Sequence, residues 1–283
     1  MAQNTQSNYQ LTQTQVSTML LQPLEAASVF LAAGPTIFDT DGSPVRVPVA
    51  PGSEADSLQW IGESELIPAN DYEFSEISLL PSTMKSIKTL TRFSNELARQ
   101  SIVSLDSVLQ SRIVNDVAAR FDQQFLGDQG DGITTPKGLF AQTASEDVDT
   151  TGALSIATVL EGLGVALANN VQTEGLTLFV RPENYMELRA ESDADGHSFI
   201  QPDATKGLVS PVLGTKVVVS NRIPAGRAAL ADMKSLGVAR DVFPQVTLLD
   251  QTFGDYDEQA IRVVSRADLG VLDSKGLITF TIA

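Results

Sequence analysis

Hydrophobic residues between positions 94 and 126 recur in steps of three and four, which is the spacing of one face of a helix. The segment opens on Ser94-Asn95-Glu96, where a small polar residue and an early acid are typical of a helix N-terminus. The apolar stripe consists of Ile102, Leu105, Val108, Leu109, Ile113, Val117, Phe121 and Phe125. The pattern predicts a helix of about six turns, at ~3.6 residues per turn, that ends at Gly127.

The second half of the chain alternates shorter helices and strands. A second amphipathic helix is predicted over residues 155–169, and a short one opens at Pro182, since proline is tolerated in a first helical turn. Buried strands are predicted over residues 176–180 and 216–219. The apolar face of the second helix is formed by Ile156, Leu160, Leu163 and Leu167.

The last forty residues are rich in strands. Residues 260–264 and 276–282 have the composition of strands, and in the second of them Ile278, Phe280 and Ile282 share one face. No internal repeat is found, and the regular alternation of strand and helix that marks a doubly wound sheet is weak. The predicted class is therefore α+β.

The N-terminal part of the chain has neither the long helical period nor the alternation of short helices and strands seen in the rest of the chain. Residues 1–18 are rich in Gln, Asn, Thr and Ser, and residues 1–38 are expected to form an arm rather than part of a core. Residues 39–84 contain five prolines, one cation (Arg46) and short strand-like runs such as 45–49 and 74–79. This stretch is expected to form an extended hairpin with an irregular tip, and long connections of this kind are usually functional.

Charge and residue usage exclude several classes of function. The chain has 35 acidic and 19 basic residues and a net charge of -16. This charge argues against a protein whose main function is to bind nucleic acid or anionic lipid. It has no cysteine and one histidine, His197, so thiol chemistry and multi-histidine metal sites are excluded. No segment is apolar for the ~18 residues that a membrane helix needs, and no secretory signal is visible.

Two motifs could carry chemistry, and each has a simpler interpretation. Residues 128–132 resemble a calcium loop, but the glycine comes one position early and Leu139 occupies the place of the bidentate Glu, which favours a turn. Asp193, Asp195 and His197 alternate as hard-metal ligands can, although such a run is more often a solvated loop. We expect no metal, cofactor or catalytic site.

The extended hairpin holds the candidate contacts with other chains. Trp60 is the only tryptophan, and it has no obvious intramolecular core to fill, so we expect an interface anchor. Glu63 and Glu65 share a face, but a proline-broken hairpin is a poor platform for paired-carboxylate catalysis. The candidate inter-subunit contacts are Trp60, Glu63, Glu65, Arg46 and Phe74.

The order of these elements resembles the major capsid proteins of tailed phages, the Hong Kong ninety-seven type. Each stretch is short, but their order and spacing together are specific from about residue 40 to the end. The stretches that carry the resemblance are Trp60 to Pro68, Phe93 to Leu97, Asp122 to Phe140, Arg181 to Phe199, Leu213 to Pro224 and Arg262 to Leu269.

The resemblance implies four parts. They are an N-terminal arm (1–38), an extended loop across a neighbouring subunit (39–84), a peripheral domain with a long spine helix (85–145, with roughly 242–268) and an axial domain (146–241, with roughly 269–283). Copies of such a chain form hexamers and pentamers that close into an icosahedral shell around double-stranded DNA, with portal, scaffolding and cement proteins as further partners. The protein is then a virion component, assembled in the host cytoplasm, and not an enzyme.

Two departures from the family have consequences. Some members crosslink through a lysine on the extended loop, and residues 39–84 hold no lysine, so no crosslink is expected. Some members also begin with a long scaffolding segment, and only about forty residues precede the loop here, so scaffolding would come from a separate protein. The low content of cations implies an inner wall that repels packaged DNA.

Two alternatives remain open at this point. The first is an encapsulin, the same fold used as the shell of a bacterial compartment, although the polar N-terminal arm favours the virus. The second is a soluble enzyme, such as a hydrolase with a serine and His197, although no Gly-x-Ser-x-Gly turn occurs.

Overall fold

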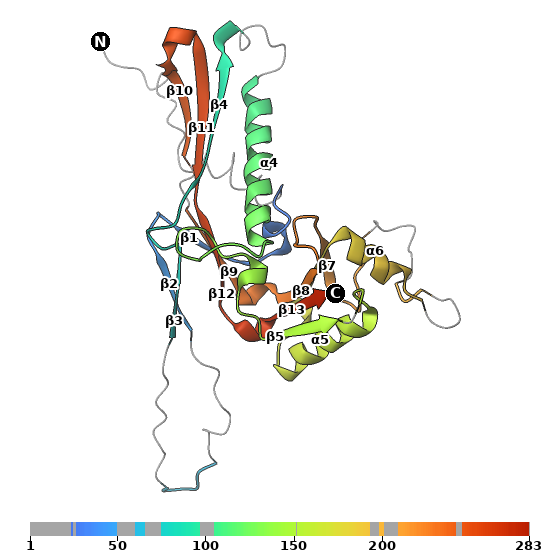
Figure 1. Cartoon of the computed structure of the whole chain (residues 1–283). Helices are drawn as coiled ribbons and strands as arrows, with labels where there is room; N and C mark the ends of the chain where they lie inside the picture. Colours follow the sequence, from blue (N-terminus) through green and yellow to red (C-terminus); the bar gives the residue numbers. More distant parts are fainter. Residues whose placement is uncertain are drawn as a thin grey trace.

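The computed structural model of the chain describes residues 24, 27–49, 60–65, 75–96, 105–150, 152–192, 198–200, 209–241 and 245–282. Within these ranges only the backbone is described for residues 105–111, 245–248, 250, 251 and 254. Figure 1 shows a tall sheet beside a long helix, a compact lobe of helices and strands to one side, and a hairpin that extends away from both. None of the helices in the described ranges has the length and hydrophobicity to span a bilayer.

The long helix is α4, Leu105–Phe125, and it packs on an antiparallel three-stranded sheet in the order β10–β11–β4. Its predicted apolar stripe is confirmed at Ile113, Val117, Phe121 and Phe125, all of which are buried. The first part of the predicted helix, residues 97–104, lies outside the described residues. The strands are β4 (Ile87–Ser94), β10 (Gln245–Phe253) and β11 (Glu258–Ser265).

The lobe is built on a five-stranded sheet in the order β5–β13–β8–β6–β7. Because side chains alternate along a strand, this sheet faces two cores. Phe179 and Ala229 pack into the core of the long helix, and Leu178 and Leu230 pack into the separate core of the lobe. The strands are β5 (Glu146–Thr150), β6 (Leu176–Val180), β7 (Lys216–Val219), β8 (Arg227–Asp232) and β13 (Leu277–Ile282). The predictions for residues 176–180, 216–219 and 276–282 are confirmed, apart from Gly276.

Two helices belong to the lobe: α5, Ile156–Ala168, and α6, Pro182–Ala190. Ser155 caps α5 by accepting a hydrogen bond from the N–H of Thr158 at 3.2 Å. The predicted buried face of α5 is wrong in part, because Leu160 and Leu167 are 58% and 59% exposed. The residues that pack are one step away on the helix, namely Val159, Gly162, Leu163 and Ala166. Both sets have helical spacing, and the choice depends on Gly162, which lies against the ring of Phe280.

A small mixed sheet in the order β1–β9–β12 ties the start of the chain to its C-terminal half. Strand β1 (Thr36–Thr40) runs parallel to β9 (Leu236–Asp241), and β12 (Ala267–Val271) runs antiparallel to β9. The expectation that residues 1–38 stay outside the core is wrong for their described part. Leu24, Phe30 and Leu31 are buried in the core of the long helix, because Phe30 packs against the rings of Phe125 and Phe179.

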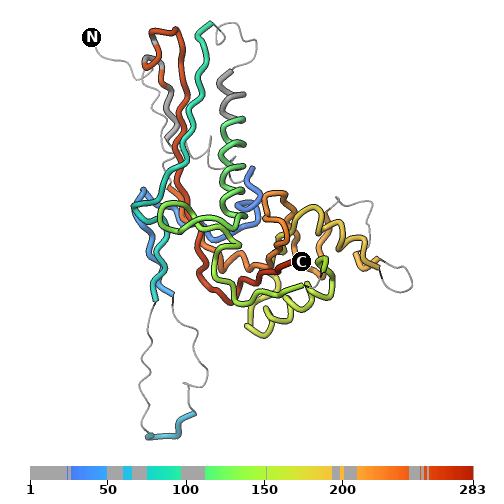
Figure 2. The backbone as a smooth tube through the Cα atoms, in the orientation of Figure 1, coloured from blue at the N-terminus to red at the C-terminus, as the bar shows by residue number. Residues whose placement is uncertain are grey.

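The predicted hairpin is confirmed in its described part. Strands β2 (Val45–Val49) and β3 (Ser75–Leu79) pair antiparallel, with Val45 opposite Leu79 and Val49 opposite Ser75. In Figure 1 the hairpin points away from α4, and Figure 2 shows residues 60–65 at its far end. This arrangement carries the loop tip away from every core of its own chain.

Candidate functional site

Residues at the tip of the extended loop are exposed, with the exception of the half-buried Ile61. The side chain of Trp60 is 105% exposed relative to its reference state, so it contacts none of the described residues to any extent. Glu65 is held in place by the N–H of Gly62, which donates to its carboxylate at 3.0 Å. We call residues 60–65 the loop tip. It presents one large aromatic ring together with the carboxylates of Glu63 and Glu65.

Of the other two predicted contacts, Arg46 lies on an arm of the hairpin. Arg46 on β2 pairs with Glu76 on β3 across 3.2 Å, and both side chains are largely exposed. This pair bridges the two strands within one chain, so it stabilises the hairpin and leaves the guanidinium partly engaged. Phe74 lies outside the described residues. The structure therefore brings Arg46 to Glu76 and does not bring it to Trp60, Glu63 or Glu65.

The base of the loop is fixed by a buried carboxylate. Asp268 on β12 is 3% exposed and accepts hydrogen bonds from the backbone N–H of Leu80 at 2.8 Å and of Leu269 at 2.9 Å. Burial raises the pKa of Asp268, and these two hydrogen bonds oppose the rise. Beside it, Arg266 donates to the carbonyl of Pro81 at 3.2 Å. Asp268 on β12 and Arg266, which directly precedes this strand, therefore hold the backbone at Leu80 and Pro81, from which the loop projects.

A turn that follows α4 supports the same base from the other side. The carboxylate of Asp131 accepts hydrogen bonds from the backbone of Ile133, Thr134 and Thr135, and these lower its pKa far below the ordinary value. The N–H of Lys85 in turn donates to the carbonyl of Thr134 at 2.9 Å. Residues 128–132, which resemble a calcium loop, therefore form part of a turn. The carboxylate of Asp131 in this turn accepts hydrogen bonds from neighbouring backbone N–H groups.

Three cations gather between the loop base and the long helix. Lys85, Lys88 and Arg120 line a groove with a volume of about 460 Å³. No carboxylate of the described residues forms an ion pair with any of them, and the nearest described polar contact is from Arg120 to the neutral Gln123 at 2.9 Å. Sequence analysis missed this groove, because its members come from two elements about thirty positions apart and form no run of charge.

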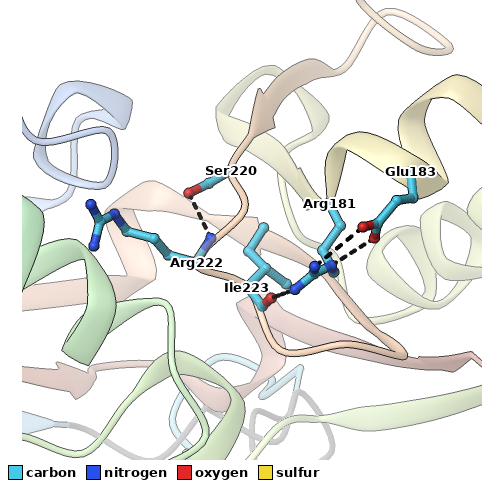
Figure 3. A network of polar contacts seen from close by, with 5 residues as sticks. All are labelled: Arg181, Glu183, Ser220, Arg222 and Ile223. Carbon is cyan, nitrogen blue, oxygen red and sulfur yellow. Dashed lines mark hydrogen bonds and ion pairs between the residues drawn. The ribbon is translucent and has the colours of Figure 1, made fainter.

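The lobe and the long helix are joined by a network of arginines (Figure 3). Arg181 donates to the carboxylate of Glu183 at 2.8 Å and to the carbonyl of Ile223 at 2.7 Å. The hydrogen bond from Arg181 lowers the pKa of Glu183. The guanidinium of Arg222 reaches the carbonyl of Ala119 on α4 at 2.7 Å. Two of the motifs that carry the family resemblance, at residues 181–183 and 220–224, therefore meet in space, and Arg222 of the second motif links the lobe to the helix.

The remaining candidates for chemistry find no support. Asp193, Asp195 and His197 lie outside the described residues. Within the ranges that are described, no cluster of three or more His, Asp or Glu side chains could hold a metal ion.

Comparison with known proteins gives one family. The sequence model described as the Phage capsid family matches residues 10–282. No curated protein matched the sequence.

Solved structures with the same fold come from phage capsids and a related particle. The capsid of a native GTA particle aligns with a TM-score of 0.72 and 16% sequence identity, over 90% of each chain. A structure from Microbacterium phage Oxtober96 aligns at 0.70 with 14% identity, over 90% of this chain and 91% of that one. One from Mycobacterium phage Cain aligns at 0.66 with 15% identity, over 96% and 98%. Identities this low establish a shared fold.

Proposed function

The chain belongs to the phage capsid family and is a structural capsid subunit, and from this we propose that its copies assemble into the icosahedral shell of a tailed double-stranded DNA bacteriophage. The single observation that carries the proposal is the family match over residues 10–282. The fold agrees with it, since the alignment with the capsid of a native GTA particle covers nine tenths of each chain.

We propose that the chain acts through contacts with copies of itself. Moving a side chain as large as that of Trp60 out of water lowers the free energy of the assembled state. Tryptophan is also enriched among interface anchors. The outer face of α5 adds a second apolar surface, with Leu160 and Leu167 both more than half exposed. In a hexamer or pentamer these surfaces would be covered by neighbouring subunits. Arg46, Glu63, Glu65 and Phe74 stay candidates for such contacts.

Four functional parts are proposed with the boundaries that the sequence suggested. The arm is 1–38, the extended loop 39–84, the peripheral domain 85–145 with roughly 242–268, and the axial domain 146–241 with roughly 269–283. The two large cores support a division of this kind, but the central sheet contributes side chains to both. Because of this shared sheet, we expect the peripheral and axial parts to unfold together.

The other partners of the shell and the place of its assembly are proposals as well. We propose that the shell encloses DNA without sequence-specific contacts, assembles in the host cytoplasm and works with portal and scaffolding proteins. The net charge of -16 supports weak contact with DNA, because like charges repel at short range. An encapsulin-type compartment is not favoured, since the structures reported above come from phages and a GTA particle.

The test is electron microscopy of the chain expressed alone, with size-exclusion chromatography of the same sample. Closed shells, or rings of five or six subunits, would support the proposal. A monomer of 30.2 kDa at every concentration and ionic strength would contradict it. Mass spectrometry of native particles then separates a virus, which contains DNA and a portal protein, from a compartment with an enzyme as cargo.

A further inference from the structure

The groove beside the loop base concentrates positive charge on a strongly acidic chain. It lies between the start of β4, the second half of α4 and residues 135–136. Lys85, Lys88 and Arg120 line it and no described Asp or Glu does, although the chain has 35 acidic residues against 19 basic ones. All three cations are exposed. Because like charges in one groove repel one another, an anion that neutralises them would bind here favourably.

The walls of the groove strengthen this attraction. The apolar side chains of Ile87, Phe121 and Pro136 also line it, and apolar walls around charge of one sign concentrate the electric field. The carboxylate of Asp131 accepts a hydrogen bond of 3.2 Å from the hydroxyl of the lining residue Thr135. It also accepts backbone N–H groups of its own turn, so part of its charge is already balanced. The volume of about 460 Å³ is within the range of pockets for small ligands.

The number and kind of the cations favour phosphate over carboxylate. A carboxylate has one charge and two oxygens, whereas a terminal phosphate group carries nearly two charges on three acceptor oxygens. Arg120 offers a planar fork that fits two oxygens of a phosphate, and Lys85 and Lys88 add two compact positive charges. Three cations around one groove therefore match a phosphate-bearing ligand better than an acidic peptide.

The positive charge continues from the groove along the exposed face of the tall sheet. Side chains alternate along a strand, so Lys88, Leu90 and Arg92 share one face of β4. Leu90 lies opposite Arg262 on β11, and both arginines are exposed. From Lys88 to Arg92 the row covers ~13 Å at ~3.3 Å per residue. Each strand of a DNA duplex carries one phosphate per ~3.4 Å, so a row of this length can contact several phosphates in succession.

We infer that the groove formed by Lys85, Lys88 and Arg120 is a binding site for phosphate groups. Two sources share this chemistry, namely the backbone of a nucleic acid and a free polyphosphate. A nucleic acid would also use the row that leads to Arg92 and Arg262, whereas a compact polyphosphate would occupy the groove alone. The inference rests on the proposed function in so far as a shell that encloses DNA brings phosphates to the chain. The net charge of -16 repels DNA elsewhere and keeps this contact weak.

Salt-dependent binding of the full chain tests the inference. The chain is titrated into a short fluorescein-labelled DNA duplex of random sequence, and anisotropy is followed at several concentrations of monovalent salt. Dissociation constants of about 10⁻⁴–10⁻⁶ M are typical of non-specific binding. The logarithm of the binding constant should fall with the logarithm of the salt concentration, with a slope of about −2.7 for three phosphate contacts and about −4.5 for five.

Neutral variants assign the binding to the groove. Lys85→Gln, Lys88→Gln and Arg120→Gln should each reduce the steepness of that slope by about 0.9 and weaken binding about tenfold at 50 mM salt. Lys275→Gln is the matched control, because it removes the same charge from an exposed lysine on the lobe and should leave the slope unchanged. Circular dichroism of each variant establishes that it folds.

A second ligand distinguishes the two sources of phosphate. Inorganic triphosphate is titrated into the same proteins and followed by calorimetry. If the source is a nucleic acid, Arg262→Gln should weaken binding of the duplex. If the source is a free polyphosphate, Arg262→Gln should have no effect, and triphosphate should bind as tightly as the duplex or more tightly. Either result supports a phosphate site in the groove.

Three outcomes would overturn the inference. The first is that neither probe binds, and the second is that the three groove variants keep the affinity and the salt slope of the wild type. The third is that poly-glutamate displaces the duplex as well as an equal charge of unlabelled DNA does, which would assign the groove to an acidic peptide. These outcomes leave the proposed function untouched when wild-type chains form shells. A chain that binds phosphate through the groove but never assembles would instead contradict the proposed function alone.

Discussion

The hydroxyl of Ser28 donates a hydrogen bond of 2.6 Å to the carboxylate of Asp122, and so joins two buried residues that are 94 positions apart. The backbone N–H groups of Val29 and Phe30 donate to the same carboxylate at 3.0 and 3.1 Å. The carboxylate of Asp122 on the long helix therefore accepts hydrogen bonds from three consecutive residues of the N-terminal segment. This contact places Phe30 between the rings of Phe125 and Phe179.

Replacing Asp122 with alanine should release this segment from the helix. The variant leaves the Ser28 hydroxyl and two backbone N–H groups without their acceptor, and such losses cost about 1–3 kcal/mol for each buried group that stays unpaired. Relaxation of the segment limits the total, so we expect the free energy of unfolding to fall by about 3 kcal/mol. Chemical denaturation measures it, and limited proteolysis should show earlier cleavage before residue 36.

Asp116 provides the matched control for that variant. It lies on the same helix, but its side chain is 68% exposed and pairs only with Arg112. Asp116→Ala should therefore change the free energy of unfolding by less than about 0.5 kcal/mol. Equal effects of the two substitutions would contradict the role given to Asp122.

The buried Asp268 should give the protein a pH dependence of unusual sign. Its pKa is raised by burial, so the folded chain holds this proton more tightly than the unfolded chain, whose Asp groups titrate near ~3.9. The contribution of Asp268 to stability is thus greatest in acid and declines as pH rises through the window above that value. Asp268→Asn removes this titration. The stability advantage of the wild type over the variant should shrink as pH rises above about 4, as measured by denaturation at each pH.

Asp131 should behave in the opposite way. The backbone N–H of Thr135 and the hydroxyl of Thr134 are the main causes of its lowered pKa, so the folded chain favours the charged carboxylate. Its contribution is present above the ordinary Asp value and is lost as pH falls through the window below about 3.9. The deficit of Asp131→Asn should therefore be larger at neutral pH than in strong acid. A deficit that changes with pH in the same direction for both variants would be inconsistent with the assigned causes.

Two glycines of α5 form a natural pair of variant and control. A Cβ at Gly162 would lie 2.5 Å from the Cζ atom of Phe280, whereas a Cβ at Gly164 would meet nothing within 4 Å. Gly162→Ala should destabilise the fold by about 1–3 kcal/mol through overpacking. Gly164→Ala should stabilise it by about 0.5–1 kcal/mol, because alanine is the better helix former. Thermal unfolding of the two variants, side by side, checks both signs.

The extended loop should not form covalent links between subunits. Residues 39–84 contain no lysine, so the loop lacks the amine that an isopeptide bond would need. Mature particles boiled in detergent should therefore run as a single band near 30.2 kDa. A ladder of multimers resistant to heat and reductant would show that another pair of residues performs the reaction.

Much of the local structure follows from the sequence. Period and composition predicted the long helix, the hairpin arm at 45–49 and the strands at 176–180 and 216–219, because each pattern reflects which side chains are buried. The face of α5 was predicted wrongly in part, because Leu160 and Leu167 satisfy the helical period as well as Val159 and Ala166, which pack. Only the position of Phe280, more than a hundred residues away, decides between them.

The sequence by itself determined the family, the exposed loop tip and the charge of that tip, since these depend on local composition and order. The tertiary structure alone decided which polar residues hold the N-terminal segment, the base of the loop and the lobe in place. The roles of Asp122, Asp268 and Arg222 could not be read from the sequence, because their partners are brought to them by the packing of distant elements. The groove of Lys85, Lys88 and Arg120 has the same origin, since charges on a strand and a helix form one site only when the two elements pack together.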